Sequence, residues 1–257
     1  IINYLDGGGN IFISSENLGE QWNGTNYYQN YFRAILLNSS TKIDVINCTS
    51  GSIYGSGVYY LDDSDSANIT DSLDGINTLE NASPILVYNA SRYYAALTYD
   101  CVYRLVYFAF PFESINGSPN RVEIMNATIR FLNASAGIPT QIYAPESLVV
   151  PIFGDLNIEI ELTGDGTPLK NRPIDVYILL ADGWNMIASN ITNSSGIATI
   201  SVSNVSYRPG TYRLAIVFHG DSTYAKSTKF ISLKVRKYYT RIEVIGSSNI
   251  LDSGGYI

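Results

Sequence analysis

The amino-acid sequence predicts an α/β domain followed by an all-β sandwich, and three observations support this multidomain assignment. Short apolar runs alternate with helix-like segments over residues 1–137, which is the pattern of an α/β domain. Short alternating runs separated by turn residues fill residues 138–237, which is typical of a sandwich. The third observation is a repeat 100 positions along, in which Thr140, Ile142, Ser147, Val150 and Gly154 recur as Thr240, Ile242, Ser247, Ile250 and Gly254. One small sandwich domain has about this length.

The repeat also predicts the domain boundaries. We expect the α/β domain at 1–137, the sandwich at 138–237, and the start of a second, truncated sandwich at 238–257. A linker as short as Lys237-Tyr238-Tyr239 would hold two sandwiches nearly end to end. The chain shows no signal peptide or apolar run of spanning length, and it opens on what looks like the last turns of a helix. We therefore interpret it as part of a longer polypeptide.

The first domain is expected to begin with the end of a helix and to close with a complete one. Its elements are expected, in order, at Ile1–Leu5 (helix), Asn10–Ser14 (strand), Tyr28–Leu36 (helix), Lys42–Asn47, Pro84–Tyr88, Tyr93–Tyr99 and Val102–Phe110 (strands), and Arg121–Leu132 (helix). The first strand is a continuous apolar run, as a parallel strand covered on both faces requires. The last helix carries Val122, Met125, Ile129 and Leu132 on one side, the arrangement of an amphipathic helix.

The second domain is expected to contain seven short strands. They are predicted at Thr140–Ala144, Leu156–Thr163, Ile174–Leu180, Trp184–Ser189, Gly196–Val202, Gly210–Phe218 and Thr228–Val235. Seven strands at this spacing favour a Greek-key β-sandwich. The runs Gly166–Leu169, Thr192–Ala198, Pro209–Tyr212 and Phe218–Tyr224 resemble the Ig-like repeats of bacterial and archaeal cell-surface proteins. In that pattern the position of His219 is variable, which implies a loop residue rather than a base or metal ligand.

Two segments of the first domain resemble the C-terminal part of class I glutamine amidotransferase-like domains. One is Tyr4-Leu5, double glycine, then Ile11-Phe-Ile-Ser; the other is Arg104–Phe110, Glu113 and the helix that follows. In catalytic members of that family the turn after the strand holds a cysteine nucleophile, and a later His-Pro-Glu-like sequence supplies the base. Here the turn is Ser14-Ser15-Glu16-Asn17, and Phe110-Pro111-Phe112-Glu113 has phenylalanine in place of the histidine.

The missing histidine predicts that the catalytic chemistry is lost. A serine hydroxyl is a weak nucleophile until an adjacent base takes its proton. The chain contains a single histidine, His219, and it lies in the other predicted domain. We therefore predict no enzymatic activity and no catalytic residue, although Ser15, Glu16 and Glu113 remain candidates for a polar pocket. We also expect no cofactor.

Acidic residues cluster in the Gly/Ser-rich stretch from Gly51 to Asp74. The cluster consists of Asp62, Asp63, Asp65, Asn68, Asp71 and Asp74. Oxygen ligands suit Ca²⁺, but Ala67 occupies the third ligand position of an EF-hand spacing and the turn glycine is absent. A solvated acidic loop is the favoured interpretation, with a Ca²⁺ site as the alternative.

Composition and sequons point to an exported protein. The formal net charge is −7 and no Lys/Arg cluster is present, which argues against nucleic acid as a partner. Asn-x-Ser/Thr triplets are far more frequent than the roughly four that chance predicts, and they indicate N-glycosylation. They lie at Asn23, Asn38, Asn47, Asn68, Asn81, Asn89, Asn116, Asn126, Asn133, Asn190, Asn193 and Asn204. In an exported protein Cys48 and Cys101 are expected to form a disulfide, with two buried thiols as the alternative.

These observations favour a non-catalytic structural or adhesive segment of a large extracellular, glycosylated cell-surface protein. It would be a component of a surface layer, stalk or filament, with neighbouring copies, other envelope proteins and N-linked glycans as partners. Few Gln, Met, Cys and His residues fit a thermophilic, archaeal source. One alternative is an accessory region of a secreted peptidase or other hydrolase. Another is a carbohydrate-binding module, which predicts a row of exposed aromatic residues on one sandwich face.

Overall fold

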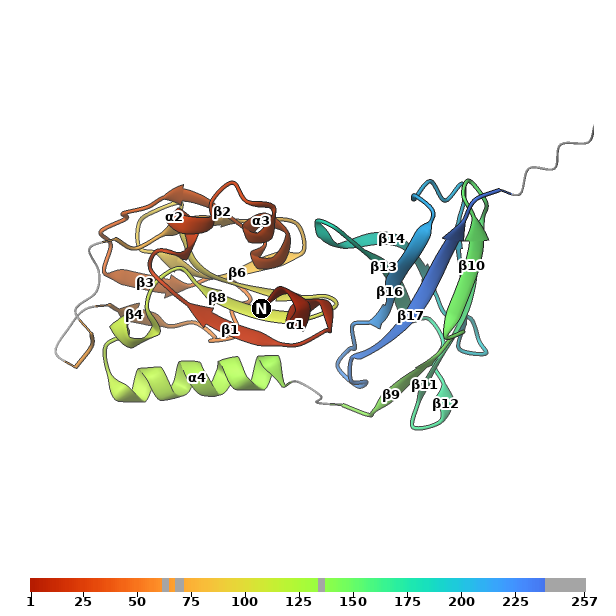
Figure 1. Cartoon of the computed structure of the whole chain (residues 1–257). Coiled ribbons are helices and arrows are strands. Elements are labelled where there is room, and N and C mark those ends of the chain that lie inside the picture. Colours follow the sequence, from red (N-terminus) through yellow and green to blue (C-terminus); the bar gives the residue numbers. More distant parts are fainter. Residues whose placement is uncertain (62–64, 68–71, 134–136, 239–257) are drawn as a thin grey trace, which may run out of the picture.

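The computed structural model describes residues 1–61, 65–67, 72–133 and 137–238. Figure 1 shows two bodies side by side, with the helices confined to the first and the second built of strands. Within the described residues, no helix is both long enough and apolar enough to cross a membrane.

The first body is built on a mixed eight-stranded sheet. Its main path runs, in spatial order, through β1 (Ile11–Ser14), β8 (Arg104–Phe108), β7 (Tyr94–Asp100), β6 (Ala82–Tyr88), β3 (Val45–Cys48) and β4 (Val58–Tyr60). A side branch pairs β2 (Ala34–Asn38) with β5 (Gly75–Thr78), which pairs with β7. Among the described pairs of this sheet only β1 and β8 are parallel. The sheet is largely antiparallel because β6, β7 and β8 follow one another through short connections.

Helices cover this sheet on both faces. The helix α4 (Ser118–Leu132) packs over β1 and β8 on one face, where Phe108, Phe110 and Ile124 share one apolar core. On the other face lie α1 (Ile2–Asp6), α2 (Leu18–Trp22) and α3 (Asn26–Phe32), with Tyr28, Phe32 and Tyr107 in a second core. The strand β1 contacts both cores, but it lies at the edge of the sheet and its four residues are only half-buried, whereas its parallel partner β8 is buried along its whole length.

The helix α4 does not place its apolar side where the sequence pattern suggests. Its buried residues are Ile124 and Thr128, whereas Val122 and Ile129 are 56% and 46% exposed. Thr128 is accepted in the core because its hydroxyl hydrogen-bonds the Tyr54 hydroxyl at 2.8 Å, which satisfies both polar groups. The helix therefore has an apolar strip that faces away from the sheet.

The second body is an all-β sandwich. Its five-stranded sheet has the order β10 (Ser147–Pro151), β17 (Ser227–Arg236), β16 (Gly210–Phe218), β13 (Pro173–Leu180) and β14 (Gly183–Ile191). Its other sheet contains β12 (Thr167–Pro168), β11 (Leu156–Gly164), β15 (Ile197–Val202) and β9 (Thr140–Tyr143). Alternate residues of β11, Leu156, Ile158 and Ile160, point into the core, as a strand with one solvated face requires.

The strand order defines an Ig-like sandwich. One sheet joins β13, β16, β17 and the extra strand β14, and the other joins β9, β11 and β15. This is the division of strands C, F, G and C′ from A, B and E in immunoglobulin domains. All seven predicted strands are present. The structure adds β10, which pairs in parallel with β17, and the short β12.

Candidate functional site: the turn after β1 and the domain boundary

The structure brings together the two segments that the amidotransferase resemblance singled out. Because β1 and β8 are parallel, the turn after Ser14 and the segment after Phe108 leave the same edge of the sheet. The Ser15 N–H donates to the Phe108 carbonyl at 3.1 Å. The Phe112 N–H donates to the Ser14 hydroxyl oxygen at 3.2 Å. These contacts join the two segments through the backbone.

The side chains at this edge form no nucleophile and base pair. The Ser15 hydroxyl oxygen accepts a 3.3 Å hydrogen bond from the Asn17 N–H, and the Asn17 amide donates to Glu16. Glu113 is exposed. In the part of the chain that the structure describes, neither the histidine nor a cysteine lies in this turn, so the geometry provides no activated nucleophile.

A buried acid that sequence analysis assigned to a solvated loop lies beside this turn. Asp74 is fully buried, and its Oδ2 accepts the Gly19 N–H at 2.8 Å. Its Oδ1 has no hydrogen-bond partner. Burial raises the pKa of Asp74 to about 7, against the lowering effect of hydrogen bonds from the Gly19 and Glu20 N–H groups, and Glu20 and Glu16 nearby raise it further. The position after a loop and before β5 gives no sequence signal for this burial.

The other acidic residues of that loop are only partly described. Asp65 accepts hydrogen bonds from the Gly117 and Ser118 N–H groups and pairs with Arg121 at 3.1 Å, which caps the start of α4. These contacts, the Gly117 N–H first, lower the pKa of Asp65. Asp62, Asp63, Asn68 and Asp71 lie outside the described residues. Among the residues that the structure does describe, no group of three His, Cys, Asp or Glu side chains is placed to hold a metal ion. The described members of the cluster therefore have structural partners of their own.

His219 is engaged in the sandwich. Its Nε2 lies 2.9 Å from Asp175 Oδ2. Burial raises the pKa of Asp175, but hydrogen bonds, from His219 and Ser189 above all, more than offset this and hold the pKa below its usual value. This pairing joins β13 to the end of β16, within the sandwich, whereas the turn after β1 belongs to the first body.

The second feature is the boundary between the two bodies, where a single apolar core crosses from one to the other. The strand β16 is buried on both faces at its end: Leu214, Ile216 and Phe218 face the sandwich core. Its Ala215 and Val217 belong instead to the core that contains Tyr28 and Phe32 of the first body. The residues of this shared core on the sandwich side are Tyr177, Trp184, Ala215 and Val217. The two bodies are therefore packed together as the layers of one protein are.

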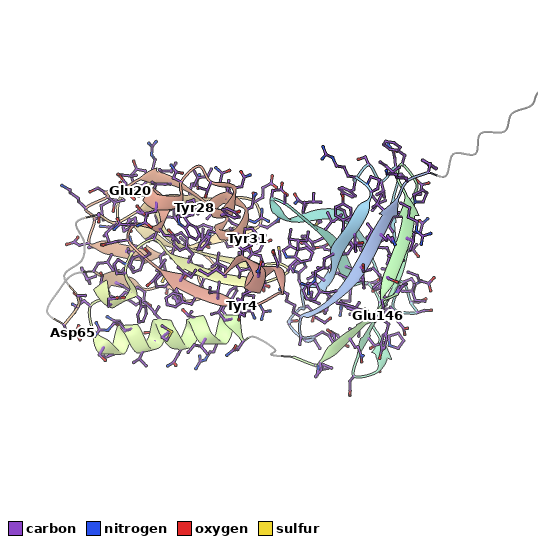
Figure 2. All side chains as sticks on the ribbon, viewed as in Figure 1. Tyr4, Glu20, Tyr28, Tyr31, Asp65 and Glu146 are labelled. Carbon is purple, nitrogen blue, oxygen red and sulfur yellow. The ribbon has the colours of Figure 1, made fainter. Side chains whose placement is uncertain are left out.

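Polar contacts reinforce the shared core. At the end of α3, Arg33 has a left-handed backbone (φ 54°) and its guanidinium donates to the Trp184 carbonyl at 3.3 Å. Arg213 donates to the Asp6 carbonyl at 3.2 Å and lies 4.0 Å from the Phe230 ring centre. Figure 2 shows Tyr31 at this end of the first body, where its hydroxyl donates to Asp6 at 2.8 Å. The bonds from Arg33 to Trp184 and from Arg213 to Asp6 cross the boundary and fix the orientation of one body on the other.

A cleft of about 210 Å³ opens at the same boundary. Its polar walls include Asn10, Arg104 and Lys226. Asp100 pairs with both cations, at 3.0 Å from Arg104 Nε and 2.5 Å from Lys226 Nζ. The Lys226 ammonium also donates to the Cys101 carbonyl. Both cations in the wall of the cleft are therefore held by the same carboxylate.

The two cysteines are free thiols in the structure and do not form the expected disulfide. The alternative of two buried thiols holds for Cys101 only, because Cys48 is half-buried. Cys48 packs with the core beneath α4, whereas Cys101 lies in the shared core on the other face of the sheet. Burial raises the pKa of Tyr99 and of Tyr177, and the neighbouring Cys101 thiol raises both further. Tyr177 reaches it from the sandwich, so this thiol also belongs to the domain boundary.

None of the sequon asparagines that the structure describes is buried. Eight are exposed, namely Asn23, Asn81, Asn89, Asn126, Asn133, Asn190, Asn193 and Asn204. Asn38, Asn47 and Asn116 are half-buried, and Asn68 lies outside the described residues. The Asn47 amide donates to the Asn89 side-chain oxygen at 3.0 Å, so these two acceptors are neighbours. The sequence prediction of glycosylation stays a prediction, and the exposure of these side chains is compatible with it.

The protein therefore has a mixed α/β body joined through a shared core to an Ig-like sandwich. No family model matches the chain, and no curated protein matches it. Two solved structures similar to part of it are Ig domains. Murine CRIg is 15% identical, with a TM-score of 0.27, over 38% of this chain and 98% of that one. The first Ig domain of the mouse polymeric immunoglobulin receptor is 14% identical, with a TM-score of 0.28, over 39% and 97%. At these scores the likeness carries no argument of its own, and the Ig-like assignment rests on the strand order.

Proposed function

We propose that this chain is a non-catalytic structural segment of a large exported, glycosylated cell-surface protein, such as a surface-layer, stalk or filament component. The observation that carries the proposal is the shared core at the domain boundary. A core that contains Tyr28 and Phe32 together with Trp184 and Val217 makes the two bodies one stiff unit. Stiffness over the length of two domains is what a spacer on a cell surface requires.

Two further observations support this function. The exposed sequons lie on both bodies, so glycans would cover the outside of the unit without entering the domain boundary. In the turn after β1, the Ser15 hydroxyl accepts a hydrogen bond from the Asn17 backbone N–H. We interpret the first body as a degenerate relative of the amidotransferase-like domains, retained as a scaffold. The repeat that starts at Thr240 extends the unit toward a tandem array of sandwiches.

The location is tested on the source organism with an antibody raised against this chain. We expect it to label intact cells, and labelling only after permeabilisation would contradict the proposal. The absence of catalysis is tested separately with the purified chain and amide and ester substrates. We expect no turnover, and the same background for Ser15→Ala. Turnover that the Ser15→Ala substitution abolishes would show that the turn after β1 is part of an active site.

A further inference from the structure

The outward side of α4 is unusual because it combines an apolar strip with two sequons. Val122 and Ile129 are seven residues apart, and both are exposed. Asn126 follows Val122 by four residues and precedes Ile129 by three, and Asn133 follows Ile129 by four. Residues three and four apart are neighbours on one side of a helix. Apolar residues and glycan acceptors therefore alternate along a single line on the surface of α4, the long helix below the sheet in Figure 1.

The first of these acceptors lies in a depression. Val122, Met125 and Asn126 line a shallow groove of about 360 Å³ together with Phe112. The groove lies on the side of α4 that faces away from Ile124 and Thr128. A sugar attached to the Asn126 amide would start inside this groove, in contact distance of the apolar side chains on either side of its own attachment point.

We propose that N-linked glycans at Asn126 and Asn133 lie along this strip and cover Val122, Met125 and Ile129. The inference rests on the proposed function, since it requires that the chain is glycosylated. Sugar rings present C–H groups as well as hydroxyls, so a chain of sugars can remove apolar surface from water and keep its polar groups hydrated. The glycans do for this strip what a protein partner does for other exposed apolar surfaces.

The position of Asn126 favours its own glycan over a docked protein as the occupant. A branched sugar in the middle of the strip would hold a protein partner away from Val122 and Ile129. The third residue of this sequon, Thr128, is buried and bonded to Tyr54. A glycosylating enzyme therefore reaches the triplet only before α4 packs, so the glycan is in place when the strip forms. Addition of the enzyme to the folded, unglycosylated chain should leave Asn126 unmodified.

The test uses glycosylated protein and two matched pairs of substitutions. Asn126→Gln with Asn133→Gln removes both acceptors on α4, whereas Asn193→Gln with Asn204→Gln removes two exposed acceptors on the sandwich. The readouts are the fluorescence of a hydrophobic dye and self-association by sedimentation velocity. We expect the α4 pair to raise dye fluorescence several-fold over the sandwich pair. Adding Val122→Ser and Ile129→Ser to the α4 pair should return the fluorescence to the level of the sandwich pair.

Site-resolved mass spectrometry separates failure of this inference from failure of the proposed function. If Asn126 is occupied and the two pairs give equal fluorescence, the covering role is wrong and the glycosylated surface segment stands. If Asn126 is unoccupied in native material while other sequons carry glycan, the inference is equally overturned. If no sequon is occupied, the inference and the glycosylation in the proposed function fail together. Contacts between sugar protons and the Ile129 methyl groups, seen as nuclear Overhauser effects, would support the inference directly.

Discussion

Lys226 of the sandwich forms an ion pair with Asp100 of the first body, with 2.5 Å between Nζ and Oδ1. Only 11% of the lysine side chain is exposed, whereas Asp100 keeps about a third of its surface in contact with water. Burial lowers the pKa of Lys226, although Asp100 beside it acts in the opposite direction. Asp100 also pairs with Arg104. This carboxylate therefore links a cation of its own domain to a cation of the other domain.

We expect Lys226→Met to destabilise the protein by about 1–3 kcal/mol. The loss stays below that of a fully buried pair because Asp100 retains Arg104 as a partner. The measurement is the free energy of unfolding from urea denaturation. Lys229→Met is the matched control, because the partner of Lys229, Glu146, is 82% exposed, and such pairs contribute less than about 1 kcal/mol. Equal losses for the two variants would contradict a special role of the Lys226 pair at the boundary.

Ala215→Asp tests whether the shared core makes the two domains one folding unit. Ala215 is fully buried against the first body, so the new carboxylate would be a buried charge with no partner, at a cost of about 3–5 kcal/mol. We expect one thermal transition for the native chain and two for the variant, measured by calorimetry. Thr211→Asp is the control, since Thr211 lies four residues earlier in the same strand and is exposed. Two transitions already in the unsubstituted chain would show that the domains unfold independently.

The thiols give a chemical test of the structure. Cys48 is half-buried and Cys101 is 4% exposed in the shared core. We expect an alkylating reagent to modify Cys48 in the folded protein and Cys101 only after denaturation, as peptide mass spectrometry can show. Ala215→Asp should make Cys101 reactive under native conditions if it separates the domains. Failure of both thiols to react in denaturant without reductant would instead establish the disulfide.

The sequence predicted the sandwich well because its strands obey a local rule. In β11 the alternation of Leu156, Ile158 and Ile160 with polar residues is visible without any knowledge of neighbours. The two strands that were missed, β10 (Ser147–Pro151) and β12 (Thr167–Pro168), are short and end in proline. The parallel pairing of β1 with β8 brings the turn after Ser14 to the same edge of the sheet as the segment that ends at Glu113.

What the sequence did not reveal depends on contacts between distant residues. The run Leu214–Phe218 in β16 is apolar at every position, which in retrospect signals burial on both faces, but no pattern identifies the partner. In α4 the core side contains Thr128 and the outward side contains Ile129, so a scale of hydrophobicity alone assigns the wrong face. Asp74 is buried by residues from α2 and β6, far from it in sequence.

Asp74 therefore provides a pH-dependent prediction that follows from tertiary structure alone. Its pKa is about 7 in the folded protein and near 3.9 in an unfolded chain, so the folded state binds the proton more tightly. Its favourable contribution to stability is complete below about pH 4 and is lost as the pH rises through about 7. Asp74→Asn keeps an oxygen acceptor for the Gly19 N–H and removes this titration.

The experiment compares the free energy of unfolding of the native chain and of Asp74→Asn at pH 5 and pH 8. Every other ionisable side chain is the same in both proteins, so the difference between the two isolates Asp74. We expect the free energy of unfolding of the variant to increase relative to that of the native chain as the pH rises. The increase is at most about 4 kcal/mol over the full range from pH 4 to above 7. Because most of that change lies above pH 5, the comparison captures the larger part of it. A difference independent of pH would mean that water reaches the carboxyl group and that the enclosure of Asp74 by α2 is looser than its full burial implies.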